Sequence, residues 1–151
     1  MEEAFANSVR YNTPMSVLII DLDHFKQIND RFGHQVGDQA LIAVARCMHN
    51  MLRDTDRLGR YGGEEFVVLL PHTAMEDALT TAEKLRASIM NLEVPEITDE
   101  RITISVGVAG YPNTGIDSID DLIQQADQAL YDAKNDGRNR VAVAASADNA
   151  T

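Results

Sequence analysis

The sequence predicts one α/β (α+β) domain, built on a mixed central β-sheet that is flanked by helices. Its 151 residues are enough for a single domain with a substantial core and too few for two. Short apolar runs alternate with segments of helical periodicity along the chain, which is the pattern of a sheet covered by helices. No internal repeat, linker or low-complexity segment interrupts this pattern.

The charge balance and the single cysteine narrow the class of protein. With 24 acidic residues against 13 basic ones the net charge is -11, which argues against nucleic acid or an anionic membrane as the main partner. A nucleotide remains compatible, since a triphosphate needs only a divalent cation and a few local bases. Cys47 cannot form an internal disulfide, which suits a reducing cytoplasm. No apolar run approaches the roughly 20 residues of a membrane span and no signal peptide is visible, so we expect a soluble, cytoplasmic domain without membrane contact.

The first half of the chain is expected to form a helix, a strand and two further helices. A weak apolar face predicts a short helix at residues 2–11. Residues 15–20 are an almost continuous apolar run, as in a strand covered on both faces, and this strand is expected to end at Asp21. The two helices that follow are predicted at residues 23–32 and 38–52.

The second half begins with a hairpin at residues 60–70 and continues with alternating helices and strands. These are expected at residues 75–92 (helix), 102–108 (strand), 118–137 (helix) and 141–144 (strand). The first of these strands has a small, polar second face, so we expect another element to pack closely against it. Ser118 and Asp121 resemble a capping box at the start of the helix predicted at residues 118–137. We place the domain at residues 1–144 and expect a disordered tail at residues 145–151.

Two glycines followed by two acids mark the hairpin. Gly62 and Gly63 predict a tight turn in which both positions adopt φ > 0. They also remove side chains from the turn, so that the phosphates of a ligand can approach the backbone. Glu64 and Glu65 follow at the start of a buried strand, which points to a metal site. The alternative is a plain hairpin with two surface acids.

Further acids lie at the end of the first strand, where Asp21 and Asp23 follow the apolar run. If the hairpin strand is its neighbour, Asp21 and Glu64 converge. Two carboxylates, completed by water and substrate phosphates, are the ligands that Mg²⁺ or Mn²⁺ prefers. Such a site suits phosphoryl or nucleotidyl transfer. The alternative for Asp21 alone is a helix cap.

Three basic residues are candidates for binding phosphates. Lys26 follows the first acids by a few residues, and Lys134 and Arg138 flank the end of the last helix. For Lys134 and Arg138 the alternative is a favourable interaction with the helix dipole. No P-loop motif is present, which excludes a Walker-type NTPase.

These residues belong to a series of motifs that spans nearly the whole chain in order. The motifs are DLDHFKQIND (21–30), FGH (32–34), GD (37–38), RYGGEEF (60–66), ISVG (104–107), AD (126–127), YDAK (131–134) and GRN (137–139). Together they resemble the GGDEF family of diguanylate cyclases. The resemblance implies a palm-like sheet related to the adenylyl cyclase core, with the Gly-Gly hairpin at its catalytic edge. It also implies condensation of two GTP molecules into cyclic di-GMP and two pyrophosphates.

The resemblance further implies a role for each matching residue. Asp21, the Leu22 carbonyl and Glu64 would hold the metal, Mg²⁺ or Mn²⁺, with two ions per active site. Glu64 would also be the base for the 3′-hydroxyl, and Glu65 an accessory acid. Lys26 would be a catalytic residue that stabilises charge on the phosphates. The remaining substrate contacts would be Asn29 and Asp38 at the guanine edge, His34 near the nucleotide, Lys134 and Arg138 on the phosphates, and Phe25, Gly62 and Gly63.

A second implied site lies in the loop before the hairpin. Arg53 and Asp56 form an Arg-x-x-Asp pattern that resembles the family's product-binding inhibitory site. Arginine can bind phosphate or guanine edges with two hydrogen bonds, and aspartate can accept from guanine. The alternative is a polar loop without a ligand.

The chain departs from the family's pattern at two places. It starts after the Leu-Thr-Gly-Leu and Asn-Arg motif of other members, so we expect a truncated N-terminal edge and a poorly anchored first helix. Lys84 stands where some members have an arginine that reaches product on a neighbouring subunit.

The sequence thus predicts a metal-dependent diguanylate cyclase domain, active as a homodimer, with product inhibition. The resemblance implies fusion to a sensor or regulatory domain in the full-length protein. One alternative is an inactive GTP or cyclic di-GMP receptor of the same fold, against which the intact Asp21, Lys26 and Glu64 argue. The other is a regulatory dimerisation module without a ligand.

Overall fold

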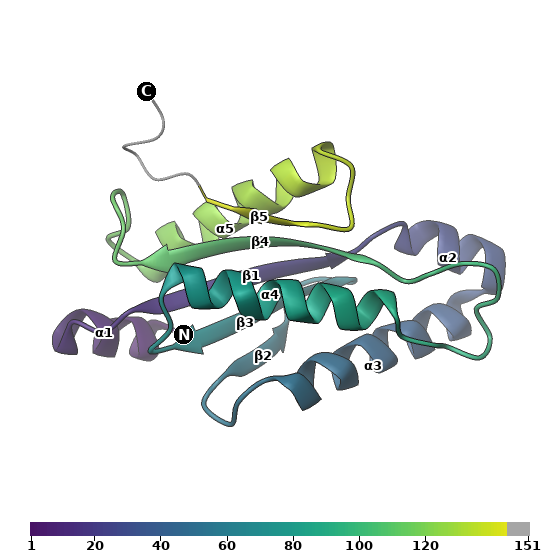
Figure 1. Ribbon diagram of the computed structural model, residues 1–151, viewed down its shortest axis with the longest axis horizontal. Coiled ribbons are helices and arrows are strands. Elements are labelled where there is room, and N and C mark those ends of the chain that lie inside the picture. Colours follow the sequence, from purple (N-terminus) through teal and green to yellow (C-terminus); the bar gives the residue numbers. More distant parts are fainter. Residues whose placement is uncertain (145–151) are drawn as a thin grey trace.

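The computed structural model describes residues 1–144 and contains a five-stranded sheet with helices on both faces (Figure 1). The strands are β1 (Met15–Leu22), β2 (Arg57–Arg60), β3 (Glu65–Pro71), β4 (Ile104–Tyr111) and β5 (Val141–Val143). The helices are α1 (Glu2–Tyr11), α2 (Phe25–Phe32), α3 (His34–Met51), α4 (Met75–Met90) and α5 (Ile119–Asn135). The strand order is β2-β3-β1-β4-β5, with β4 and β5 parallel and the other pairs antiparallel. This mixed sheet confirms the predicted fold class; the predicted tail at 145–151 lies outside the described residues.

The central strand β1 is longer than predicted. It continues through Asp21 to Leu22, because β3 pairs with it on one side and β4 on the other along nearly its whole length. Every residue of β1 is buried, as the continuous apolar run indicates. Asp21 is therefore not a helix cap after the strand but a buried strand residue, which lies opposite Glu65 on β3 and Ser105 on β4.

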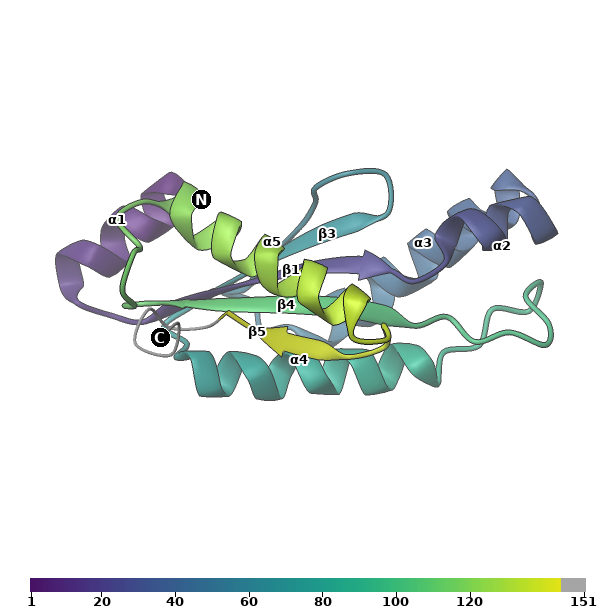
Figure 2. The ribbon, with the colours of Figure 1, turned by 90° about the horizontal axis from the view of Figure 1, so that it is seen from above.

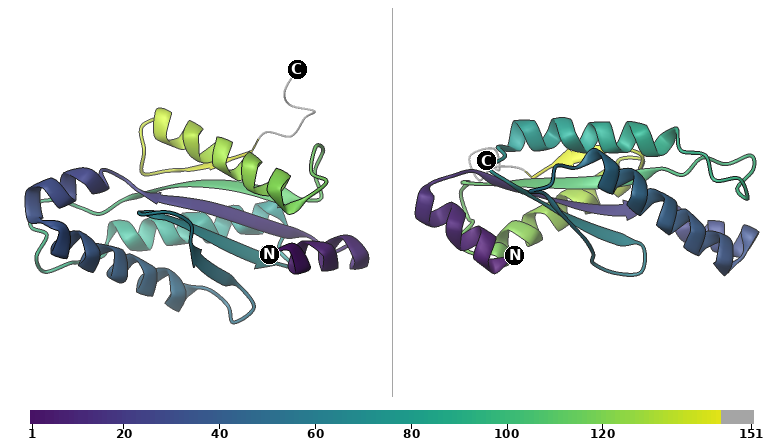
Figure 3. Two further views of the ribbon diagram at one scale, coloured as in Figure 1. Left: turned by 180° about the vertical axis from the view of Figure 1, so that it is seen from behind. Right: turned by 90° about the horizontal axis from the view of Figure 1, so that it is seen from below.

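Each face of the sheet has its own apolar core. Helices α3 and α4 cover one face, and α1 and α5 cover the other, whereas α2 packs against α3 beyond the ends of the strands (Figures 2 and 3). Side chains of β1 alternate between the two cores, with Leu18 and Ile20 in the first and Val17 and Ile19 in the second. Close packing against β4 is confirmed at Gly107, where an added Cβ would lie 2.0 Å from a backbone oxygen of α5.

The predicted glycine turn of the hairpin needs correction. Gly62 and Gly63 have no φ in the left-handed region, so they do not form the two-residue turn with positive φ at both positions. Instead the strands stop at Arg60 and resume at Glu65, and the Tyr61 and Gly62 N–H groups both donate to the Glu65 carbonyl, at 2.8 and 3.3 Å. The wider loop satisfies these donors without φ > 0.

The third helix begins four residues earlier than predicted. Gly33, at φ 93°, separates α2 from α3, and α3 starts directly at His34 rather than at Asp38. The Gly37 N–H donates to the Gly33 carbonyl at 3.1 Å, which closes the first turn. Apolar periodicity could not locate this turn, because it carries no buried apolar side chain.

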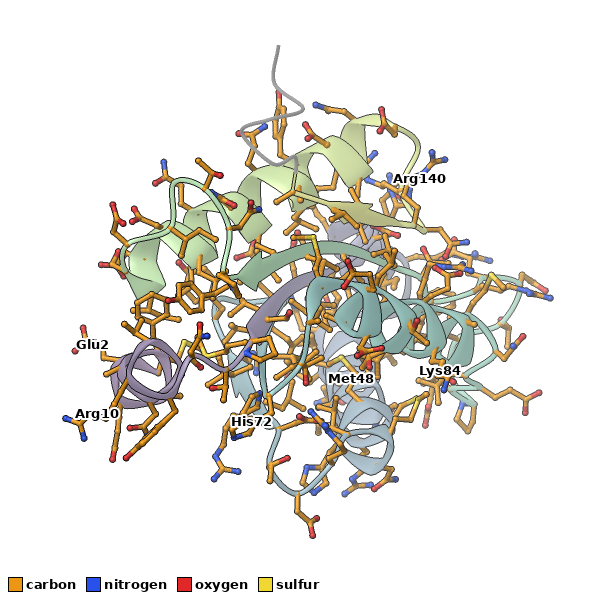
Figure 4. All side chains as sticks on the ribbon, turned by 60° about the vertical axis from the view of Figure 1, so that its left-hand side comes forward. Glu2, Arg10, Met48, His72, Lys84 and Arg140 are labelled. Carbon is orange, nitrogen blue, oxygen red and sulfur yellow. The ribbon has the colours of Figure 1, made fainter. Side chains whose placement is uncertain are left out.

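The first helix is anchored, contrary to expectation. Phe5 and Ser8 of α1 are buried, and the Phe5 ring packs edge-on against Tyr111 of β4, with the ring centroids 5.1 Å apart. Glu2 and Arg10 point away from the body of the protein (Figure 4). One helical face thus completes the core that α1 shares with α5. None of the described helices combines the length and the apolarity that a bilayer crossing requires.

Candidate active site

The carboxyl groups converge at one end of the sheet because of the strand register. Asp21 of β1 lies opposite Glu65 of β3, and the Leu22 N–H donates to the Glu64 carbonyl at 3.3 Å. The hairpin strand is therefore the neighbour of β1, which is the arrangement on which the predicted convergence of Asp21 and Glu64 depends. The Lys134 ammonium, from the last turn of α5, forms an ion pair with Asp21. We call Asp21, Glu64 and Glu65 the carboxyl cluster.

The electrostatics of the carboxyl cluster favour a cation. Burial raises the pKa of Asp21, and the hydrogen bond from Lys134 opposes this effect only in part. Burial, followed by the nearby charge of Asp21, also raises the pKa values of Glu64 and Glu65. Three acids whose charged forms are disfavoured share one lysine, so a further positive charge would be stabilising.

One atom in particular fits a metal ion. The Asp21 Oδ1 oxygen is buried and has no hydrogen-bond partner, whereas Oδ2 is bound to Lys134. A buried carboxylate oxygen without a partner is unfavourable, and a divalent cation would satisfy it. Within residues 1–144 no group of three or more His, Cys, Asp or Glu side chains is placed to hold a metal. Ligation by Asp21 and Glu64 would therefore need the Leu22 carbonyl and phosphate oxygens as well.

The three candidate phosphate-binding residues differ in position. Lys134 contacts Asp21 directly, and the charge of Arg138 is near enough to lower the pKa of Asp21. Arg138 lies in the turn between α5 and β5, with φ 63°. Lys26 is exposed in the first turn of α2, and in the described part of the chain it has no ion pair with the carboxyl cluster.

The residues predicted to bind guanine come together on the α2–α3 pair. Asn29 presents a buried Oδ1 that has no hydrogen-bond partner, and an added Cβ on Gly37 would lie 1.7 Å from it. Phe25 is buried beside the same glycine. His34 and Asp38 are exposed on the first turns of α3. A groove continues from Asp38 between α3 and the hairpin, and it is lined by Asp38, Leu41, Ile42, Ala45, Leu58, Gly59, Arg60 and Phe66.

Arg53 and Asp56 lie in the loop before β2. This loop is next to the end of β3 that is farthest from Glu65. Asp56 has only 3% of its side chain exposed and pairs with Arg53 at 3.0 Å. The same guanidinium donates to the Pro71 carbonyl at 3.2 Å and to the Thr73 hydroxyl at 2.7 Å. Arg53 thus ties its loop to the end of β3 and still exposes 56% of its side chain.

Two residues near the site received no role from the sequence. Arg60 braces the hairpin loop, because its Nε donates to the Gly62 and Gly63 carbonyls at 3.3 and 3.2 Å. Asp23 is buried and accepts hydrogen bonds from the Thr103 and Ser105 hydroxyls at the start of β4. It also accepts from the Asn139 N–H, just before β5. The sequence marks Arg60 by its place two residues before the glycine pair, whereas the partners of Asp23 lie more than 75 residues away along the chain.

A family model described as "Diguanylate cyclase, GGDEF domain" matches residues 1–140. The chain belongs to the GGDEF family. Among curated relatives, the diguanylate cyclase DgcM of Escherichia coli is 48% identical over 129 residues, which are 85% of this chain and 30% of the relative. The probable diguanylate cyclase DgcC of the same species is 41% identical over 145 residues, 96% of this chain and 39% of the relative. This GGDEF domain thus spans less than half the length of these relatives.

Solved structures of other GGDEF domains have the same fold. The active GGEEF domain of a diguanylate cyclase from Vibrio cholerae is 38% identical, with a TM-score of 0.89 that covers 97% of this chain and 92% of that one. The GGDEF domain of DgcB from Caulobacter crescentus, solved with cyclic di-GMP, is 35% identical, with a TM-score of 0.87 over 95% of this chain and 85% of that one. The family and the fold inferred from the motifs are therefore confirmed.

Proposed function

We propose that this GGDEF domain is the catalytic domain of a diguanylate cyclase, which joins two GTP molecules into cyclic di-GMP and releases two pyrophosphates. The observation that carries the proposal is the carboxyl cluster: Asp21, with its unpartnered buried oxygen, lies next to Glu64 of the Gly-Gly hairpin. Membership of the GGDEF family supports the choice of GTP as substrate.

In the proposed reaction, the 3′-hydroxyl oxygen of each GTP attacks the α-phosphorus of the other. A new P–O bond forms, the bond between the α-phosphorus and the α–β bridging oxygen breaks, and pyrophosphate leaves with that electron pair. Glu64 accepts the hydroxyl proton, for which its raised pKa is suited. Lys26, Lys134 and Arg138 bind the phosphates and offset the charge that develops on them.

The proposed cofactor is Mg²⁺ or Mn²⁺, two ions per active site. Asp21, the Leu22 carbonyl and Glu64 would hold it, and the unpartnered Oδ1 of Asp21 supports this. The ion supplies positive charge that screens the triphosphate and orients it. Asn29 and Asp38 would read the guanine edge, with His34, Phe25 and the two hairpin glycines around the nucleotide.

The stoichiometry of the product leads us to propose a homodimer. One carboxyl cluster can hold one GTP, whereas the product joins two, so two domains must face each other. We also propose feedback by cyclic di-GMP at Arg53 and Asp56, where the exposed guanidinium can still reach a phosphate. We place the reaction in the cytoplasm, where GTP is available, with a sensor or regulatory domain in the full-length protein.

A receptor function is the second candidate. Solved GGDEF domains bound to cyclic di-GMP favour it, and such a receptor would bind the nucleotide without turning it over. Incubation of the concentrated domain with GTP and Mg²⁺, followed by chromatography, separates the two candidates. Formation of cyclic di-GMP supports the cyclase; binding of GTP or cyclic di-GMP without turnover supports the receptor. Absence of both leaves a regulatory dimerisation module.

A further inference from the structure

The turn between α5 and β5 has an unusual backbone. Gly137, Arg138 and Asn139 follow one another at φ 127°, 63° and 47°, all in the left-handed region. For residues other than glycine this conformation is unfavourable by roughly 1–2 kcal/mol each, and asparagine tolerates it best. Two consecutive non-glycine residues in this conformation persist only where the surroundings hold them. Arg138, a candidate phosphate ligand, is one of the two.

The buried carboxylate of Asp23 holds this turn from the β1 side. Its Oδ2 accepts from the Asn139 N–H at 2.9 Å and from the Thr103 hydroxyl at 2.7 Å, and its Oδ1 accepts from the Ser105 hydroxyl at 2.6 Å. Asp23 is 5% exposed, so these three donors take the place of water around its charge. Asp23 is also two residues after Asp21 of the carboxyl cluster.

Helix α4 holds the same turn from the other side. The Arg86 Nη1 donates to the Asn139 Oδ1 at 2.9 Å, and the Asn139 Nδ2 contacts the Met90 sulfur at 3.4 Å. Arg86 is itself oriented by Glu83, which accepts from its Nε at 2.9 Å. Asn139 is therefore bound through its backbone to the end of β1 and through its side chain to α4.

We propose that Asp23 and Asn139 are positioning residues for the phosphate-binding turn; together with Arg86 they form what we call the turn clamp. They fix Arg138 relative to Asp21, so that the phosphate ligand and the metal ligand keep one spacing. This inference rests on the proposed function, since it needs a triphosphate at the site. It also links α4 to the phosphates, because Arg86 reaches Asn139 directly.

Two variants test the turn clamp. Asn139→Gly keeps a residue that adopts positive φ and keeps the N–H for Asp23, but it removes the contacts to α4. Asp23→Ala removes the carboxylate, and Asp23→Asn restores an oxygen that can accept from Asn139. Thr103→Val is the matched control, because it deletes one hydrogen bond to Asp23 and leaves the turn in place.

The readout is the ratio of two dissociation constants, measured with Mg²⁺ by calorimetry. One ligand is a GTP analogue with a methylene group at the α–β bridge, and the other is GMP, which lacks the β- and γ-phosphates. We expect Asn139→Gly and Asp23→Ala to lower the preference for the analogue about tenfold, the size of one lost charge-assisted hydrogen bond, with GMP affinity unchanged. Thr103→Val and Asp23→Asn should stay within about twofold of wild type.

The outcomes separate the inference from the proposed function. If wild type shows no preference for the analogue over GMP, the proposed GTP site is wrong. If wild type prefers the analogue and both Asn139→Gly and Asp23→Ala keep that preference, the turn clamp has no positioning role. If Asn139→Gly weakens both ligands equally, its effect is general and the inference is overturned. Should Asp23→Ala fail to fold, Asn139→Gly still tests the side-chain link between the turn and α4, and an unchanged preference overturns that link.

Discussion

At the scale of single residues, the burial and charges of the carboxyl cluster favour an added cation. Asp21 is 4% exposed, and Lys134 is the partner of one of its oxygens. Glu64 and Glu65 lie near it with pKa values raised by burial and by its charge. Ionising all three acids in the absence of metal therefore works against folding.

We expect Glu64→Gln to stabilise the metal-free domain at pH 7 and not at about pH 4. The folded pKa of Glu64 lies above its ordinary value of 4.5, so between the two values the folded protein binds more protons than the unfolded one. The free energy of unfolding therefore falls as pH rises through that interval, and glutamine removes this loss. Urea unfolding in EDTA at both pH values measures the change that Glu64→Gln makes to the free energy of unfolding. The matched control is Glu93→Gln, at an exposed position; an equal effect at both pH values would contradict the cause.

The same variant should nearly abolish turnover. Glu64→Gln removes both a proposed metal ligand and the proposed base, and loss of a base alone typically slows a reaction about 10²-fold. Chromatographic detection of cyclic di-GMP from GTP and Mg²⁺ gives the rate, with circular dichroism as the check on folding. Activity above about a tenth of wild type would remove Glu64 from the role of base.

At the scale of elements, the α2–α3 pair depends on a glycine in the first turn of α3. A Cβ at Gly37 would overlap the Asn29 side chain, so a larger residue fits there only if Asn29 moves. Gly37 has no left-handed φ, so its requirement is one of space and not of backbone conformation. The buried Asn29 oxygen is thereby held at a defined place, available to a ligand.

Gly37→Ala should lower GTP affinity as well as stability. Its Cβ would lie 1.7 Å from the Asn29 Oδ1 and 3.3 Å from the Phe25 Cζ, so the Asn29 side chain must move. Overpacking of this kind destabilises by about 1–3 kcal/mol. The control is Gly63→Ala, where an added Cβ meets nothing within 4 Å, and which should leave the unfolding midpoint unchanged. Unaltered GTP affinity of a folded Gly37→Ala would remove Asn29 from guanine binding.

The loop between α3 and β2 gives a prediction with two parts. Arg53→Ala should relieve inhibition by cyclic di-GMP without lowering the initial rate. It should also destabilise the domain by roughly 1 kcal/mol, because the buried Asp56 carboxylate and the Thr73 hydroxyl lose a donor. Progress curves with added cyclic di-GMP and urea unfolding measure the two parts. Arg57→Ala, at the first residue of β2 after this loop, removes only hydrogen bonds to backbone carbonyls and should change neither inhibition nor rate.

At the scale of the whole molecule, the proposed reaction needs two domains. Specific activity should rise with protein concentration, since each domain contributes one GTP to a product that contains two. Initial rates over a dilution series, compared with the mass from light scattering, test this. Specific activity that stays constant down to concentrations at which the protein is monomeric would contradict the proposed homodimer.

The sequence revealed local features of this molecule better than distant ones. Apolar runs located β1, β3, β4 and β5 but not β2, which is Arg-Leu-Gly-Arg (57–60). On the condition that the hairpin strand lies beside β1, as β3 does, the approach of Asp21 and Glu64 could be foreseen. The extension of β1 through Asp21 could not, because it depends on pairing with β3 and β4. The turn clamp was equally hidden: Asp23 and Asn139 are 116 residues apart, and no local pattern records their hydrogen bond.

The pairing of β1 on both sides has a mechanical consequence. This strand of eight residues runs from α1 to the carboxyl cluster, a path of about 26 Å at roughly 3.3 Å per residue. Sliding it would break hydrogen bonds to β3 and β4 at once and carry each side chain to the wrong face of the sheet. A displacement of α1 would therefore move the domain as a rigid body and leave the geometry of the carboxyl cluster unchanged. Regulation that entered through α1 would then change the orientation of one domain relative to the other in the proposed homodimer.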